Sequence, residues 1–198
     1  MKSDKPSENF KNYFPNLSEL EFEALMTICE YKEYPGKSVI LKCGNQLKKV
    51  FLILQGSVRG YVFDEKGNEK NILLRSKGIF VGDAEAIFGD MPQKLTIESL
   101  DYTRVLLFSI TDFENLAEHH KGIQKIYLYG LKEAILRLTY RVHSLITLNS
   151  EQRYLDLLKK NPDFLKDAYD KYVANYLGIT AVSFSRIKKG LKNKAINK

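Results

Sequence analysis

Residues 170–189 read DKYVANYLGITAVSFSRIKK, and this stretch has the spacing of a helix-turn-helix motif. Ala174 is small, as a close crossing of two helices requires, and Gly178 can adopt the positive φ of the turn between them. Apolar residues that would hold the two helices at a steep angle are Val173, Leu177, Ile179, Phe184 and Ile187. The pattern predicts two short helices that meet at Gly178. The alternative is an ordinary helical hairpin with a glycine between its helices.

The second helix of this motif is expected to begin after Thr180, a suitable N-cap, and to run from Ala181 to about Gly190. A helix in this position lies in the major groove of DNA. The predicted DNA-binding residues are Thr180, Ala181, Val182, Ser183, Ser185, Arg186, Lys188 and Lys189. Arg186 suits a bidentate contact with guanine, whereas Thr180 and the two serines suit phosphates or base edges. The lysines, including Lys192 and Lys194, would add salt-dependent affinity for any sequence.

Positive charge is concentrated around this motif. The chain has 198 residues and a formal charge of +7, and eleven basic residues stand against five acidic ones from Asn149 onward. Such an excess favours a polyanionic partner, here double-stranded DNA. A solvated lysine-rich face is the ordinary alternative.

Between Tyr34 and Phe108 the apolar residues alternate with a period of two, in runs separated by glycines and polar turns. The predicted strands are 38–42, 50–55, 58–63, 70–75, 96–99 and 103–108, and residues 64–68 have the composition of a hairpin turn. Six short strands at this spacing predict an antiparallel β-roll, or jelly roll. Residues 10–31 precede it with helical spacing, and Ser18 is a suitable cap.

Helical periodicity then runs from Thr111 to about Leu148. Within it, six apolar residues follow one another in steps of three and four, as in a coiled coil: Leu128, Leu131, Ile135, Leu138, Val142 and Leu145. The simplest partner for this seam is the same seam of a second copy, so the sequence predicts a homodimer. Packing of the seam on the chain's own β-domain is the alternative.

The fold class expected from these segments is α+β. Asn149 and Gln152 have the spacing of a capping box that restarts a helix, which places a domain boundary there. We therefore predict a sensor β-roll at 1–110, a dimerisation helix at 111–148 and a helix-turn-helix domain at 149–198.

Several classes of protein are disfavoured by composition. The polar opening stretch and the lack of a long apolar run predict a cytoplasmic protein with neither signal peptide nor membrane contact. Cys29 and Cys43 cannot supply the four ligands of a thiolate metal site. No histidine lies between Tyr34 and Phe108, which removes the usual ligands of metal enzymes built on a β-roll. We expect no catalytic residues, no metal and no other cofactor.

In this order of segments the chain resembles the cyclic AMP receptor/fumarate-nitrate regulator (Crp–Fnr) family of bacterial transcription regulators, over nearly its whole length. The resemblance rests on Gly36, Gly44, 51–58 (FLILQGSV), 78–83 (GIFVGD), 151–154 (EQRY), 176–180 (YLGIT) and 185–187 (SRI). It implies a cyclic-nucleotide-binding-type roll, a homodimer, and DNA and RNA polymerase as partners. Family members usually carry a β-hairpin wing after the reading helix. Few residues follow that helix here, so little or no wing is expected.

Nucleotide-binding members of this family hold a cyclic phosphate with a Phe-x-Gly-Glu turn and a later Arg-Ser pair. The positions that match the turn are Phe80, Gly82 and Asp83, and those that match the pair are Gln93 and Lys94. With Thr139, which matches a base-contacting hydroxyl, these residues form the predicted effector pocket. Because the arginine fork is missing, the resemblance argues against cyclic AMP. Another small molecule or closely packed side chains remain as interpretations.

A different class of function also stays open. Ala181 and Val182 at the reading edge of the second helix are apolar. They would suit a module that senses a ligand or binds a partner but no longer reads DNA.

Overall fold

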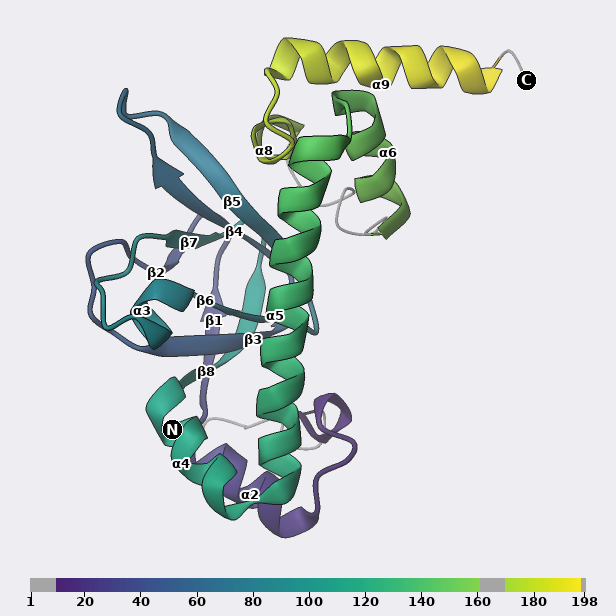
Figure 1. Cartoon of the computed structure of the whole chain (residues 1–198). Coiled ribbons are helices and arrows are strands. Elements are labelled where there is room, and N and C mark those ends of the chain that lie inside the picture. Colours follow the sequence, from purple (N-terminus) through teal and green to yellow (C-terminus); the bar gives the residue numbers. More distant parts are fainter. Residues whose placement is uncertain (1–9, 161–169, 197–198) are drawn as a thin grey trace.

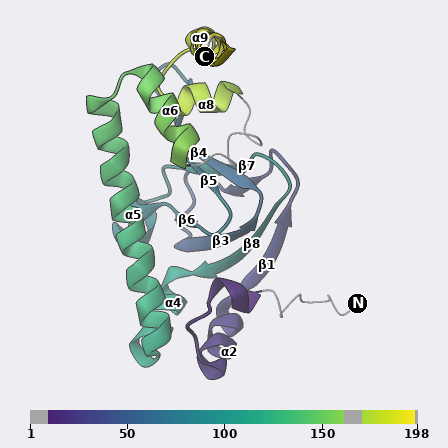
Figure 2. The same cartoon turned by 90° about the vertical axis from the view of Figure 1, so that its right-hand side faces the viewer.

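The computed structural model describes residues 10–160 and 170–196. Two four-stranded antiparallel sheets form a roll, with a long helix along one side and the C-terminal helices at one end of that helix (Figures 1 and 2). The first sheet has the strand order β1 (Glu30–Tyr34), β8 (Thr103–Ser109), β3 (Lys49–Gln55) and β6 (Phe80–Gly82). The second has the order β2 (Val39–Leu41), β7 (Thr96–Ser99), β4 (Ser57–Phe63) and β5 (Glu69–Ser76).

The six predicted strands are all present, with bounds within one residue of those expected. Strands β1 and β6 were missed, because both depend on pairing rather than on local pattern. β1 has the polar sequence EYKEY and pairs with β8 along its whole length, whereas the three residues of β6 pair with β3. The prediction of helical structure up to Tyr31 was therefore wrong beyond Ile28.

Strand β3 shows how the roll and its covering helices share one sheet. Its residues Val50 and Leu52 face a core formed with the helices, and Phe51 and Ile53 face the core inside the roll. Both faces are covered, so this central strand reads as a nearly continuous apolar run. β8 is built in the same way.

Two helices follow the roll where one was predicted. α4 (Ile110–His119) and α5 (Lys121–Thr147) are separated by His120, whose backbone is extended at φ −128° and ψ 105°. α2 (Glu19–Ile28) explains the break. Its Glu21, which forms the capping box with Ser18, also accepts the amide of Gly122 at 2.6 Å. A tertiary contact thus caps α5 and turns it away from α4.

The remaining helices of the described chain are η1 (Lys11–Tyr13), α3 (Ala84–Phe88), α6 (Ser150–Lys160), α8 (Asp170–Tyr176) and α9 (Ala181–Ile196). The predicted capping box before α6 is confirmed, since Asn149 and Gln152 exchange hydrogen bonds of 2.9 Å. α9 continues past Gly190, where the sequence placed its end. A search of the described helices finds none with the length and apolar content to cross a bilayer.

Candidate nucleic-acid interface and its attachment to the roll

The turn between α8 and α9 has the geometry that the sequence predicted. Gly178 has φ +73°, a backbone conformation that L-residues with a side chain resist. Its amide donates to the carbonyl of Asn175 at 2.9 Å, and the amide of Ile179 donates to the carbonyl of Ala174 at 3.0 Å. Ala174 is buried at the crossing of the two helices. The helix-turn-helix shape is therefore confirmed.

The N-terminus of α9 is held by a side-chain cap and an aromatic contact. Thr180 Oγ1 accepts the amide of Ser183 at 3.1 Å, as expected of an N-cap. One turn further, the ring of Phe184 is buried edge-on against Tyr154 of α6, with 4.9 Å between centroids. These contacts anchor the inner face of α9 and leave its other face outward.

The structure divides the eight predicted DNA-binding residues by exposure. Thr180, Ala181, Val182, Ser185, Arg186 and Lys189 are exposed, whereas Ser183 and Lys188 are half-buried. Lys188 is held by Asp170 of α8, with 2.7 Å between Nζ and the nearer carboxylate oxygen. α9 lies at the end of the molecule that is remote from α4 (Figure 1). The side chains of Lys192 and Lys194, and all of Lys166 and Lys198, lie outside the described part of the chain.

A second apolar surface runs along α5. Of the six residues in the predicted seam, Leu131 is half-buried and the other five are exposed: Leu128, Ile135, Leu138, Val142 and Leu145. The exposed fractions of Ile135 and Leu138 are 63% and 65%. α5 runs along one side of the roll (Figure 2). Its Ile123 is fully buried, and its Gly130 lies beside Phe80 of β6. The seam therefore does not pack on the chain's own β-domain, and that alternative is wrong.

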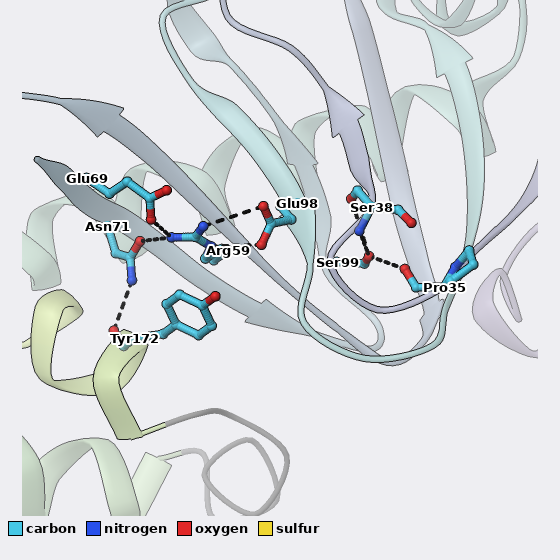
Figure 3. A network of polar contacts seen from close by, with 8 residues as sticks. All are labelled: Pro35, Ser38, Arg59, Glu69, Asn71, Glu98, Ser99 and Tyr172. Carbon is cyan, nitrogen blue, oxygen red and sulfur yellow. Dashed lines mark hydrogen bonds and ion pairs between the residues drawn. The ribbon is translucent and has the colours of Figure 1, made fainter. Parts of the chain in front are cut away.

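A buried arginine attaches the helix-turn-helix to the roll (Figure 3). Arg59 of β4 is only 3% exposed, and its Nε lies 3.2 Å from Glu98 Oε1 of β7. The guanidinium also pairs with Glu69 and donates to Asn71 Oδ1 at 3.3 Å, both on β5. It lies 4.2 Å from the centroid of the Tyr172 ring of α8. Burial alone would lower the pKa of Arg59, but the two glutamates raise it above its ordinary value.

Two asparagines extend this attachment. Asn71 Nδ2 donates to the carbonyl of Tyr172 at 3.0 Å, and the Asn71 amide donates to Asn175 Oδ1 at 2.6 Å. Around them, Leu74 and Leu100 of the roll join one apolar core with Tyr154, Val173 and Phe184. Sequence analysis missed this junction. Its only local signal is a lone arginine within the apolar strand Ser57–Phe63.

The predicted effector residues have partners of their own. Asp83 caps α3 through the amide of Glu85, and its other carboxylate oxygen accepts the amides of Lys94 and Leu95 at 2.7 and 2.8 Å. Three bonds leave at most one acceptor position for a ribose hydroxyl. Lys94 Nζ is paired with Glu85 at 2.7 Å.

The other effector positions differ in their surroundings. Phe80 packs edge-on against Phe108, and a side chain at Gly82 would strike Ile87. Gln93 is buried, and its Oε1 has no hydrogen-bond partner among the described residues. Thr139 is exposed on α5. An effector role for these six residues stays a prediction.

The two cysteines do not pair with each other. Burial raises the pKa of the Cys29 thiol to about 12, whereas Cys43 is exposed. Within residues 10–160 and 170–196, histidines, cysteines and carboxylates form no cluster of three or more that could hold a metal ion.

Comparison with known proteins agrees with this architecture. Residues 31–120 match the model of the cyclic nucleotide-binding domain. The cAMP-activated global transcriptional regulator CRP of Pasteurella multocida is 32% identical over 62 residues, which are 31% of this chain and 30% of that protein. The chain therefore covers less than a third of this relative's length.

Solved structures are similar over far more of the chain. The c-di-GMP-responsive global regulator CLP of Xanthomonas campestris matches with a TM-score of 0.69 and 14% identity, over 90% of this chain and 93% of that one. A protein from Eubacterium rectale assigned to the crp/fnr family of transcriptional regulators matches with a TM-score of 0.67 and 13% identity, over 92% and 88%. The TM-scores establish a shared fold, and at identities this low they establish no more than that. The curated relative and the Xanthomonas protein are named as regulators, not as enzymes.

Proposed function

We propose that the chain is a homodimeric regulator that binds DNA in a sequence-specific manner. The proposal starts from two findings: residues 31–120 match the model of the cyclic nucleotide-binding domain, and the fold is shared with a solved protein assigned to the crp/fnr family of transcriptional regulators. The observation that carries the proposal is the outward face of α9. Ala181, Val182, Ser185, Arg186 and Lys189 are exposed together on a helix whose inner face is anchored by Phe184. This is the arrangement by which a reading helix enters the major groove.

The exposed seam on α5 supports dimerisation. Monomeric proteins rarely leave a long row of large apolar side chains in water, and a parallel copy of the same helix would cover it. Two copies joined along α5 would present two α9 helices to one DNA duplex. Reading of two half-sites one helical turn apart requires the helices to lie about 34–36 Å from each other. The expected operator is therefore close to palindromic.

A small effector bound in the roll would act by shifting the balance between arrangements of the two reading helices. The buried Oε1 of Gln93, which has no hydrogen-bond partner within the described part of the chain, supports a polar ligand near β6 and β7. The ion pair of Lys94 with Glu85 and the three amides on Asp83 argue against recognition of a cyclic phosphate. The proposed effector is thus a small molecule other than cyclic AMP.

The test is a selection of genomic fragments with the purified full-length protein, followed by fluorescence anisotropy with the best fragment and with a scrambled duplex. Both are measured at two salt concentrations. A specific reader keeps its preference for the selected fragment as salt rises, because base contacts add to the phosphate contacts that salt weakens. If both duplexes lose affinity together and equally, the chain is a basic surface without sequence reading.

A further inference from the structure

Residues of β5, α5, α6 and α8 line a cavity of about 160 Å³ between the roll and the helix-turn-helix. Its lining is strongly basic. The charged side chains in it are Arg75, Arg137, Arg141, Arg153, Lys160 and Asp156. Among the described residues, five cations thus face a single carboxylate in a partly open cavity.

Two of these cations are compensated by ion pairs. Arg137 pairs with Glu133 at 2.8 Å, and Lys160 pairs with Asp156 at 3.3 Å. Lys160 Nζ also lies over the ring of Tyr140, 3.2 Å from its centroid. Asp156, the one carboxylate of the lining among the described residues, is therefore already engaged.

The other three arginines are held by neutral groups. Arg75 donates to the carbonyl of Leu74 at 2.8 Å, Arg153 donates to those of Leu148 and Leu177 at 2.6 and 3.1 Å, and Arg141 donates to that of Tyr176. Among the described residues, no carboxylate lies within ion-pair distance of any of the three. Backbone carbonyls orient a guanidinium but leave its charge uncompensated.

The guanidinium groups also destabilise one another's charge. Burial lowers the pKa of Arg75 and of Arg141, and Tyr176 acts against this shift. Neighbouring arginines add to the lowering: Arg137 acts on Arg75, and Arg153 and Arg75 act on Arg141. Arg137 Nε is buried and lacks a hydrogen-bond partner among the described residues. Like charges packed in this way favour the binding of an anion between them.

We propose that this cavity binds a phosphate-bearing small molecule whose phosphate group is held by Arg75, Arg141 and Arg153. Guanidinium groups suit this task because their planar donor forks match the oxygens of phosphate. The cavity is smaller than the roughly 300–1,000 Å³ of pockets that enclose a whole ligand, so it fits the phosphate group itself. Any remaining part of the ligand extends toward the opening. This site is separate from the predicted effector pocket around Asp83.

The position of the site gives its occupant a mechanical role. Arg75 belongs to the roll, Arg141 to the long helix and Arg153 to α6. Tyr176 of the helix-turn-helix lies 3.9 Å from the guanidinium of Arg141. A phosphate bound between the three arginines would join three parts of the chain. A bound phosphate would hold the helix-turn-helix against the roll.

The experiment measures thermal unfolding and calorimetric binding of the full-length chain with three probes. These are inorganic phosphate, adenosine 5′-diphosphate and adenosine, at constant ionic strength set with chloride. Inorganic phosphate at about 100 times its dissociation constant is expected to raise Tm by roughly 5–10 °C. The diphosphate is expected to do the same, and adenosine to have no effect. Tighter binding of the diphosphate than of inorganic phosphate would assign the site to a phosphorylated metabolite, and equal binding would assign it to phosphate alone.

Variants R141Q and R75Q are expected to lose the phosphate-dependent rise in Tm. Without phosphate these variants are expected to be at least as stable as the parent, because each removes a positive charge that neighbouring arginines repel. R104Q is the matched control, since Arg104 also has a buried, unpartnered Nε but lies on β8 outside the cavity. Absence of any phosphate effect in the parent, or an equal effect in R141Q and R75Q, would overturn the proposal. None of these measurements involves DNA, so they test the phosphate site whether or not α9 binds DNA.

Discussion

The backbone amide of Asn71 on β5 donates to Oδ1 of Asn175 on α8, with 2.6 Å between the two atoms. Asn175 Nδ2 donates in turn to the carbonyl of Glu69 at 2.7 Å, so one side chain bridges two residues of the same strand. β5 pairs with β4 on one side only, as it ends its sheet. Asn175 therefore provides the hydrogen-bond partners that a further strand would otherwise supply to the backbone of β5. The helix-turn-helix is attached to the roll through the sheet edge itself.

Replacement of Asn175 by alanine is expected to loosen this attachment. The change leaves the Asn71 amide without its acceptor and should lower the free energy of unfolding by about 1–3 kcal/mol. Hydrogen exchange of the Asn71 amide and of α8 should become faster, while that of β3 stays unchanged. Asn193→Ala, at an exposed position of α9, is the matched control. Unchanged protection of α8 in Asn175→Ala would show that the apolar core alone holds the junction.

Loss of the Arg59 charge is expected to lower the stability of the protein mainly because it leaves a buried glutamate without its partner. Arg59→Met removes the cation beside Glu98, which is largely buried, and should cost roughly 3–5 kcal/mol in urea unfolding. Arg59→Met combined with Glu98→Leu should recover at least half of that loss, because no buried charge then lacks a partner. A double variant as unstable as the single one would contradict this account.

The apolar seam on α5 is expected to hold the dimer. Ile135→Glu with Leu138→Glu places two charges on the seam and should convert the protein to a monomer in sedimentation velocity at micromolar concentration, with its circular dichroism unchanged. His143→Glu, which adds a charge at an exposed position of the same helix outside the seam, should leave the dimer intact. A parent protein that sediments as a monomer would refute the seam as an interface.

Arg186 is expected to discriminate between DNA sequences. Arg186→Ala should weaken binding to the selected operator by about 1–3 kcal/mol more than binding to a scrambled duplex, since a bidentate contact with guanine is lost. Lys189→Ala should weaken both duplexes alike and reduce the dependence of affinity on salt. Anisotropy titrations at two salt concentrations separate the two effects. Equal weakening of both duplexes in Arg186→Ala would remove Arg186 from sequence reading.

The thiol of Cys29 is expected to respond to alkaline pH. Its pKa in the folded protein, about 12, is higher than the value of about 8.5 in an unfolded chain. The unfolded state therefore loses its proton first as pH rises. The stabilisation from the neutral thiol is complete below about pH 8.5 and is lost between there and pH 12.

Cys29→Ser should accordingly lose less stability than the parent between pH 8.5 and 10.5 in urea unfolding. Mass spectrometry after iodoacetamide treatment at pH 8 should find label on the exposed Cys43 and little on Cys29. Rapid labelling of Cys29 in the folded protein would contradict the raised pKa.

Local patterns in the sequence predicted much of the fold. The six expected strands, the caps at Ser18, Asn149 and Thr180, and the turn at Gly178 are all present. These features depend on backbone conformation and on side chains within a few residues, so neighbouring sequence is sufficient to specify them. The apolar stripe of α5 was also predicted, because helical spacing alone places its residues on one face, whereas its exposure was decided by the structure.

Only the tertiary structure decided the contacts between segments that are distant in the sequence. The break at His120 depends on Glu21, the strand β1 depends on β8, and the junction at Arg59 and Asn71 depends on Tyr172 and Asn175. The cluster of Arg75, Arg141 and Arg153 belongs to the same group, since three separate elements bring these charges together. Sequence by itself determined the six predicted strands, the helix caps and the turn at Gly178, because those follow from periodicity and local backbone conformation. Folding in three dimensions decided which polar and charged groups are buried side by side, because the spacing of residues along a chain does not specify contacts between distant segments.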